Sequence, residues 1–264
     1  MPSLPLRRED RNGVATLTLA NAESRNALSL LAIDSLIVAL ADIEKEPAVR
    51  VAVIAGDGPA FSAGHDLKEI QAHRNDEDAG AAYFDKLMRR CAELMRGIVD
   101  LPMPVIAAVE GVATAAGCQL VAACDLAIAG EGARFALPGV NIGLFCSTPL
   151  VAVGRAVSRK AAMELALTGE PVDARRAESL GLVNRIVAAG SALAEAQALA
   201  AKIAARPAAV IALGKRTFQR QIETSLADAY RIASDAMLEN LGLPEAGEGV
   251  AAFLEKRPAR WSDR

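Results

Sequence analysis

Two glycine-bearing turns carry the residues whose types and spacing could do chemistry. One is Ser62-Ala63-Gly64-His65-Asp66 and the other is Gly111-Val112-Ala113-Thr114-Ala115-Ala116-Gly117. Each turn follows a hydrophobic strand and opens a helix. Backbone N–H groups at two such helix starts can point at one carbonyl oxygen and form an oxyanion hole. The sequence therefore predicts a site that stabilises negative charge developing on a carbonyl oxygen.

The elements around these turns follow a repeated strand, turn, helix order. Residues 49–55 are a continuous apolar run closed by glycine and proline, which is typical of a buried strand followed by a turn. Asp66 then precedes residues 67–70 with the Asp-x-x-Glu spacing of a capped helix start. The order repeats in the strand at 105–109 and the helix at 115–124. Both donor turns are therefore expected at strand-to-helix junctions of an α/β chain.

The last third of the chain is almost entirely helical by its periodicity. The character changes near residue 190, which predicts a core over 1–190 and a helical region over 191–264. Strands are also expected over 14–19, 126–129 and 183–187, and helices over 26–40, 80–99, 158–167, 173–180, 191–205, 208–221, 226–240 and 247–256.

Composition and charge exclude several classes of protein. Lys and Arg number 29 against 32 Asp and Glu, with no basic run that would follow a phosphate backbone, so nucleic acid is not an expected partner. The four cysteines lack CxxC pairing and read as reduced thiols, and no metal-ligand spacing occurs. The first ten residues lack an apolar targeting segment, and no unbroken apolar run reaches ~18 residues. We expect a cytoplasmic protein without a membrane span.

Five motifs, in order along nearly the whole chain, carry a resemblance to a known family. Residues 25–28 match R-N-A-L, residues 61–69 match F-x-A-G-x-D-L/I-K-E, and residues 111–125 match G-x-x-x-G-G-G-x-E/D-L-x-x-x-C-D. Residues 167–187 and 248–257 match two later motifs. In these motifs the chain resembles the crotonase (enoyl-CoA hydratase/isomerase) superfamily.

The resemblance implies a crotonase-like spiral of ββα units with a helical C-terminal trimerisation region. It also implies homotrimers, often paired into hexamers, and lyase-type chemistry of fatty acid metabolism. The ligand is an acyl-CoA thioester, and coenzyme A enters only as part of that substrate, with no separate cofactor. Its thioester oxygen should meet the N–H groups of His65 and Ala116. An alanine replaces the family's usual glycine at position 116 and keeps the N–H.

Further coenzyme A contacts are implied by the same resemblance. Ala63, Asp66 and Leu67 correspond to the family's contacts with the adenine ring and with the rest of coenzyme A. Phe253 and Lys256 correspond to a C-terminal helix that completes the site of a neighbouring subunit.

The chain departs from the family where a hydratase carries its acids. The two usual glutamate positions are occupied by Gln119 and Gly139, and an alternative acid position by Ser147. Glutamine can orient water but cannot accept a proton at neutral pH, and glycine has no side chain. Two-acid hydration and single-base isomerisation are therefore not expected.

The remaining polar residues near the expected acyl pocket leave two interpretations of His65. In the first, which we favour, only the backbone N–H of His65 contributes to the oxyanion hole. In the second, the imidazole transfers a proton or binds a carboxylate. Cys146 is interpreted as a packed thiol, and Ser147 as the polar start of the next helix, with a hydroxyl able to cap it. Asn141 is a polar residue near the pocket, Asp125 is interpreted as structural, and His73 as a residue of a solvated loop. Three functions stay open: non-hydratase acyl-CoA chemistry such as a decarboxylation, slow hydration, and a catalytically silent acyl-CoA-binding subunit.

Overall fold

A six-stranded sheet in the order β1-β2-β3-β5-β7-β10 lies at the centre of the protein, whose computed structural model describes residues 5–262. Only β1 runs antiparallel to its neighbour; the other pairs are parallel, with Ile54 opposite Ala107 and Ala107 opposite Ala127. The strands are β1 (Leu6–Arg11), β2 (Val14–Leu19), β3 (Val51–Gly56), β5 (Val105–Val109), β7 (Leu126–Gly130) and β10 (Arg185–Val187).

A second sheet has four strands in the order β4-β6-β8-β9. The strands β3, β5 and β7 belong to the large sheet, and the strand that follows each of them along the chain belongs to the small one. This alternation is the predicted spiral of ββα units, and it is confirmed. The strands of the small sheet are β4 (Ala60–Ser62), β6 (Val112–Thr114), β8 (Arg134–Ala136) and β9 (Val172–Asp173).

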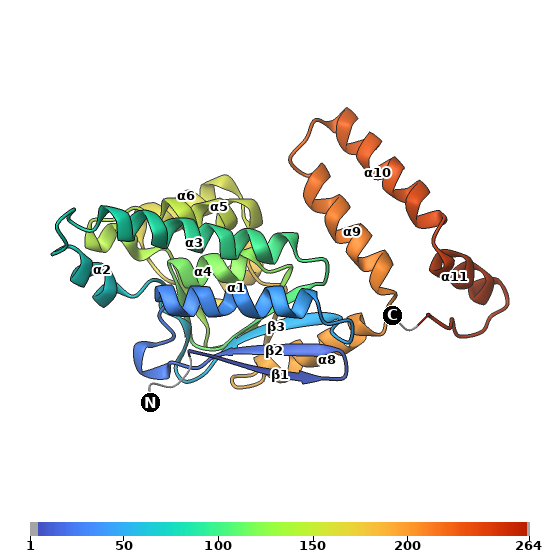
Figure 1. Cartoon of the computed structure of the whole chain (residues 1–264), viewed down its shortest axis with the longest axis horizontal. Coiled ribbons are helices and arrows are strands. Elements are labelled where there is room, and N and C mark those ends of the chain that lie inside the picture. Colours follow the sequence, from blue (N-terminus) through green and yellow to red (C-terminus); the bar gives the residue numbers. More distant parts are fainter. Residues whose placement is uncertain (1–4, 263–264) are drawn as a thin grey trace.

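Helices cover both faces of the large sheet (Figure 1). On one face α1 (Leu30–Glu44), α3 (Ala81–Asp100) and α4 (Ala116–Ala123) enclose the larger core, in which Leu17, Ile54 and Leu94 are fully buried. On the other face α8 (Ala192–Ala204) packs its small residues Ala192, Ala196 and Ala200 against the strands. Strands buried on both faces explain the continuous apolar runs at β3 and β5.

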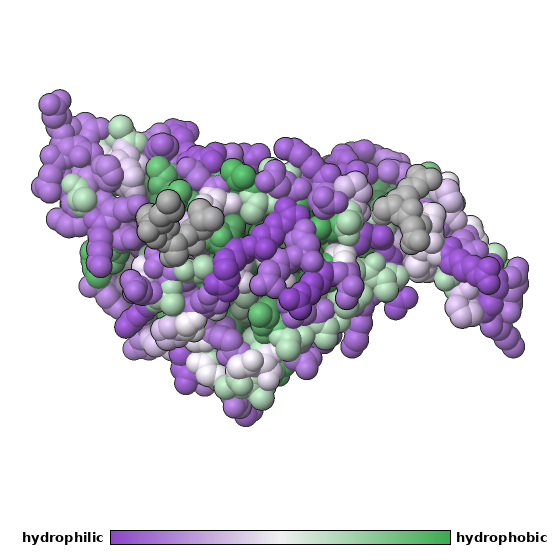
Figure 2. Space-filling view, turned by 60° about the horizontal axis from the view of Figure 1, so that its bottom comes forward, coloured by the Kyte–Doolittle hydropathy of each residue, from purple (hydrophilic) through white to green (hydrophobic). Residues whose placement is uncertain are grey.

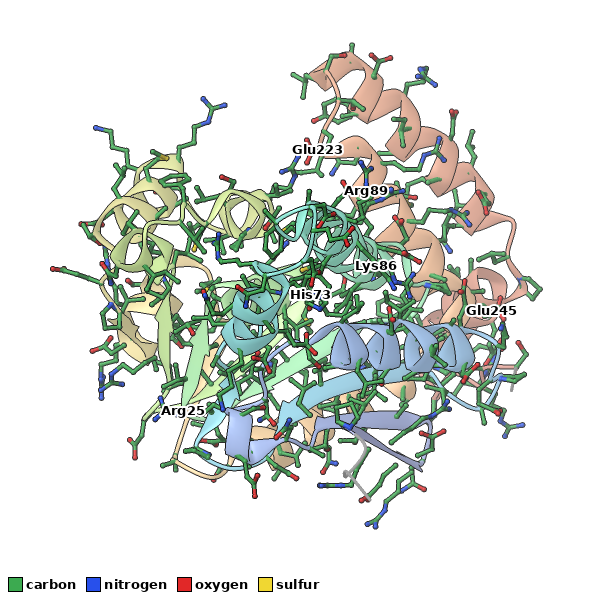
Figure 3. All side chains as sticks on the ribbon, turned by 60° about the vertical axis from the view of Figure 1, so that its left-hand side comes forward. Arg25, His73, Lys86, Arg89, Glu223 and Glu245 are labelled. Carbon is green, nitrogen blue, oxygen red and sulfur yellow. The ribbon has the colours of Figure 1, made fainter. Side chains whose placement is uncertain are left out.

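The helix α8 lies just after the predicted boundary at residue 190, yet it is part of this packed core. The helices that stand apart are α9 (Ala208–Gln221), α10 (Leu226–Leu241) and α11 (Pro244–Leu254), which we call the C-terminal arm. Figure 1 shows the arm projecting from the body, and Figure 3 marks it with Glu223 in the turn between α9 and α10 and with Glu245 on α11. α8 and α9 meet at 107°. The remaining helices are α2 (Leu67–His73), α5 (Ser147–Ala156), α6 (Arg159–Thr168) and α7 (Ala174–Leu180).

Some predicted boundaries are wrong for local reasons. The first helix begins at Leu30 rather than at residue 26, because Arg25 and Asn26 have positive φ and Ser29 caps the helix through Ala32 N. The strand β1 was not predicted, because its charged sequence LRREDR has no apolar alternation; it is an exposed sheet edge, where charge discourages pairing with other chains. α11 begins at Pro244, three residues before the predicted start, since proline suits a first helical turn.

The face of the molecule shown in Figure 2 carries mostly hydrophilic residues, with hydrophobic residues in separate areas between them. Within residues 5–262, no single helix is long and apolar enough to cross a membrane, and α8 with α9 passes that test only as a bent pair. The N-terminal segment considered for targeting lies partly outside the described residues, since residues 1–4 are not among them.

Candidate functional site

The first donor turn connects β4 to α2 and is held against residues 25–28. Leu28 N donates to Gly64 O at 2.7 Å, and Ala63 N donates to Arg25 O at 2.9 Å. Gly64 has a φ of +85°, which glycine adopts without strain. The R-N-A-L segment, assigned to a helix by its periodicity, instead forms a backbone support for this turn.

The second donor turn ends β6 and begins α4. Ala115 N donates to Ala136 O at 2.9 Å, which fixes the turn to β8. Ala115 itself has φ 49° and ψ −117°, a backbone conformation that costs a non-glycine residue on the order of 1–3 kcal/mol. Ala116 follows as the first residue of α4, and the first N–H groups of a helix have no partner within the helix.

The two turns touch each other. A Cβ placed on Gly64 would lie 3.2 Å from Ala116 N, and Thr114 Oγ1 donates to Ala63 O at 3.1 Å. Across residues 5–262, no hydrogen bond uses the N–H of His65 or of Ala116. The structure therefore brings the two predicted donors into neighbouring turns and leaves both N–H groups available.

The imidazole of His65 is held by the first turn. Its Nδ1 lies 3.4 Å from Leu28 O, so in the tautomer that makes this bond Nδ1 carries the proton and Nε2 is an acceptor. Nε2 is buried without a hydrogen-bond partner. Burial lowers the pKa of His65 below its usual value, and the bond to Leu28 opposes this only in part. A neutral ring whose free nitrogen is an acceptor is poorly suited to bind a carboxylate.

Gln119 lies one helical turn beyond Ala116 and is 3% exposed. Its Oε1 accepts a weak hydrogen bond from Cys91 Sγ of α3, with a separation of 3.9 Å. The residue also lines a cleft of about 1090 Å³ between the body and α9. Gln119 is thus a buried amide directed toward α3, and an amide can orient a ligand without transferring a proton at neutral pH.

Gly139 lies in the short 3-10 helix Pro138–Ile142 and has no space for a side chain. A Cβ there would lie 2.9 Å from both Cys146 Sγ and Leu144 O. The thiol of Cys146 therefore occupies the volume that an acidic side chain would need to enter. Burial raises the pKa of Cys146 above its usual value, which agrees with the interpretation of a packed thiol.

Three other polar residues were singled out in the sequence. Ser147 is the first residue of α5, as expected, but α5 has no side-chain cap, and the Ser147 hydroxyl lies 3.5 Å from Phe145 O. Asn141 is exposed. His73, interpreted as a solvated loop residue, ends α2, stacks on Tyr83 with ring centroids 3.7 Å apart, and has Nδ1 2.7 Å from Asp76 Oδ2 (Figure 3).

The residues predicted to contact coenzyme A fall into two separate groups. Asp66 Oδ1 accepts from Lys68 N at 2.8 Å and so begins α2, while Leu67 is 52% exposed beside it. Phe253 is 83% exposed on α11, and Lys256 follows that helix. α2 and α11 lie on opposite sides of the molecule in Figure 1, so one chain does not bring the two groups together.

A buried ion pair attaches the C-terminal arm to the body, and sequence analysis found only half of it. Asp125, interpreted as structural, accepts from Val105 N at 2.8 Å and from Lys215 Nζ at 2.7 Å. Lys215 Nζ also donates to Ile98 O and Met103 O at 3.0 and 3.1 Å. No local signal marks Lys215, because its partner lies 90 residues earlier.

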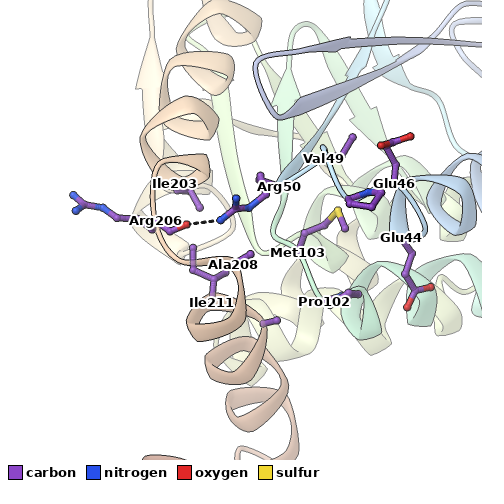
Figure 4. Close-up of a pocket in the computed structure, with 12 residues that line it drawn as sticks. Glu44, Glu46, Val49, Arg50, Pro102, Met103, Ile203, Arg206, Ala208 and Ile211 are labelled. Atoms are coloured by element: carbon purple, nitrogen blue, oxygen red, sulfur yellow. Dashed lines mark hydrogen bonds between the residues drawn. The ribbon is translucent and has the colours of Figure 1, made fainter. Parts of the chain in front are cut away.

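Other candidate sites carry less chemistry. A pocket of about 190 Å³ at the corner between α8 and α9 contains none of the predicted site residues; there a guanidinium nitrogen of Arg50 donates to Arg206 O at 2.8 Å (Figure 4). No group of three or more His, Cys, Asp or Glu side chains that could hold a metal ion occurs in the described part of the chain.

Comparison with known proteins supports the family resemblance and the fold. A family model described as Enoyl-CoA hydratase/isomerase matches residues 9–264. Enoyl-CoA hydratase domain-containing protein 3, mitochondrial, of Xenopus laevis is 46% identical over 254 residues, covering 96% of this chain and 85% of the relative. A crystal structure of enoyl-CoA hydratase from Mycobacterium smegmatis has a TM-score of 0.92 at 49% identity, covering 97% of this chain and 98% of that one. The human enoyl Coenzyme A hydratase domain-containing protein 3 has a TM-score of 0.92 at 43% identity, covering 97% and 100%.

The names of the relatives contradict the expected cytoplasmic location. The Xenopus laevis protein and its namesakes from rat, mouse, human and zebrafish are all called mitochondrial. The expectation depended on cysteine usage and on the first ten residues, which were read as lacking a targeting segment. Unpaired thiols distinguish reducing from oxidising surroundings, and they do not distinguish one reducing compartment from another.

Proposed function

This chain belongs to the enoyl-CoA hydratase/isomerase family, and on that basis we propose that it binds an acyl-CoA thioester through the N–H groups of His65 and Ala116. One observation carries the proposal: two backbone donors in touching turns have no acceptor among the described residues. A thioester oxygen placed between them would accept both hydrogen bonds.

The chemistry that follows is stabilisation of a thioester enolate. When the carbon next to the thioester transfers a proton to a base, or its carboxylate group departs as carbon dioxide, the electron pair stays behind and negative charge develops on the carbonyl oxygen. Donors that are already in position stabilise that charge by ~3 kcal/mol each, because they need not reorganise during the reaction. An oxyanion hole of this kind can assist several reactions that pass through a thioester enolate. It therefore supports this class of reactions but does not identify which of them the protein catalyses.

The residues at the proposed acid positions argue against ordinary hydration. Gln119 cannot act as a base at neutral pH, and position 139 has no side chain, in a place where even a Cβ would lie 2.9 Å from Cys146 Sγ and Leu144 O. Hydration by this chain is therefore expected to be slow. Decarboxylation with His65 as a carboxylate ligand is also disfavoured, because the ring is neutral and its free Nε2 is an acceptor. Enolate chemistry that needs no protein carboxylate, or binding without turnover, fits the site best.

Assembly into trimers or hexamers is part of the proposal. The arm exposes large apolar side chains that a solvated monomer would have to keep in water. Phe253 and Lys256 would then complete the coenzyme A site of a neighbouring subunit, which agrees with their distance from α2. The exposed apolar residues of the arm are Phe218, Ile222, Leu226, Tyr230, Met237, Leu238, Leu241, Val250, Phe253 and Leu254.

Calorimetry with acyl-CoAs of several chain lengths tests the proposal directly. We expect binding of at least one thioester and no comparable binding of the corresponding free fatty acids, which lack the coenzyme A part. If no thioester binds to protein that circular dichroism shows to be folded, the proposed function is wrong.

A further inference from the structure

Two of the few buried polar residues in the described core, Ser62 and Asn26, lie directly behind the first donor turn. Ser62 is fully buried and Asn26 is 2% exposed. The Asn26 side chain is fully used: Nδ2 donates to Asp57 O at 2.9 Å and to Ala60 O at 2.8 Å, and Oδ1 accepts from Asn21 N at 3.0 Å. The Asn26 side chain is therefore a fixed point that holds residues 21–26 against the turn between β3 and β4.

Ser62 connects this fixed point to the donor turn. Its hydroxyl donates to Asn26 O at 2.9 Å and accepts from Gly64 N at 3.2 Å. On the other side of the same residue, Leu28 N donates to Gly64 O. Because the peptide bond from Gly64 to His65 is planar and trans, its N–H points opposite to its C=O. The hydrogen bonds to Gly64 N and Gly64 O fix the peptide planes on both sides of Gly64, and they thereby fix the direction of the His65 N–H.

Ser62 also contacts the second donor turn. A Cβ placed on Gly117 would collide with the carbonyl oxygen of Ser62 and lie 2.8 Å from Ser62 Cβ. Gly117 is the residue after Ala116, so the backbone of Ser62 packs against the first turn of α4 with no intervening side chain. One residue therefore contacts both halves of the proposed hole, with its hydroxyl on one side and its backbone on the other.

We propose that Ser62 is a positioning residue that sets the alignment of the His65 N–H relative to the Ala116 N–H through its hydroxyl bonds to Asn26 and Gly64. This inference rests on the proposed function, because it matters only if the two donors bind a thioester oxygen. Ser62 does not touch the substrate. Removing its hydroxyl should leave the fold and the acyl pocket in place and misalign one donor.

The test uses a conjugated 2,4-dienoyl-CoA as an optical probe. Hydrogen bonds to its thioester carbonyl polarise the conjugated chain and move its absorption band to longer wavelength, and the spectrum is recorded before any hydration removes the conjugation. The variants are Ser62→Ala, which removes the hydroxyl, and Ser62→Cys, which keeps a weaker donor and acceptor. The matched control is Thr16→Val, which removes the buried hydroxyl that accepts from Gln197 Nε2 at 3.1 Å, on the side of the sheet covered by α8.

We expect a clear red shift with the wild type and with Thr16→Val. The shift should be about half as large with Ser62→Ala, because one of two donors loses its alignment, and intermediate with Ser62→Cys. A full shift with Ser62→Ala at saturating probe overturns the inference, as does an equal reduction with Thr16→Val. If Ser62→Ala does not fold, an unchanged shift with Ser62→Cys overturns it. Absence of binding and shift in the wild type would instead refute the proposed function.

Discussion

Replacing Lys215 by methionine should destabilise the protein strongly, because it leaves a buried carboxylate without its partner. The Lys215 side chain is 8% exposed and the Asp125 side chain 19% exposed. Breaking a buried pair by removing one partner costs about 3–5 kcal/mol. Asp125 keeps its hydrogen bond from Val105 N, which places Lys215→Met near the lower end of that range. A loss of about 3 kcal/mol is large against the typical 5–15 kcal/mol free energy of unfolding.

The loss should also depend on pH. Burial raises the pKa of Asp125, and Lys215 opposes the rise, so Lys215→Met should raise it further. A carboxyl group whose pKa is higher in the folded than in the unfolded state binds more protons when folded. The free energy of unfolding therefore falls as pH rises from the unfolded-state pKa of Asp125 to its folded-state pKa. These two pKa values lie further apart in the variant than in the wild type, so the variant's deficit should be larger at pH 8 than at pH 5.

Urea unfolding followed by circular dichroism at both pH values measures this deficit. Arg155→Met is the matched control, since it breaks the exposed pair between Arg155 and Glu223 at the far end of α9, and should cost under about 1 kcal/mol. Combining Lys215→Met with Asp125→Asn should recover part of the loss. A deficit below about 1 kcal/mol at pH 8, or one that does not change with pH, would refute this account of the arm's attachment.

Three further predictions concern the site and the assembly. Hydration of crotonyl-CoA should be at least ~10²-fold slower than in ordinary hydratases for each missing acid, and Gln119→Glu should raise the rate. A wild-type rate equal to that of ordinary hydratases would show that positions 119 and 139 are not those of the lost acids. Gly139→Glu, in contrast, should fold poorly because of Cys146. His65→Ala should keep thioester binding and most of any activity, since it keeps the N–H; a ~10²-fold loss of turnover at unchanged affinity would assign the imidazole to catalysis. Light scattering should give a trimer or hexamer, and Phe253→Asp should weaken assembly or coenzyme A affinity; a stable wild-type monomer at micromolar concentration would contradict this.

Much of the fold could be predicted because its signals are local. The apolar runs at β3 and β5 and the periodicity of α9 identify those elements from neighbouring residues alone. The start of α2 after its N-cap Asp66 followed from a capping pattern four residues long. Both donor turns were found in the same way, since each is a short segment between a strand and a helix. Where local signals compete, as at positive-φ Arg25 and Asn26, the helix boundary was misplaced.

Only the tertiary structure shows the contacts between segments that are distant in the chain. The support of Gly64 by Leu28, the approach of Ser62 to Gly117 and the pairing of Asp125 with Lys215 each join segments between 36 and 90 residues apart. Likewise, the lack of space at Gly139 depends on where Cys146 packs. Such contacts form only when separate elements pack into one core, so sequence spacing predicts the donors themselves, while packing decides how they are aligned and what space surrounds them.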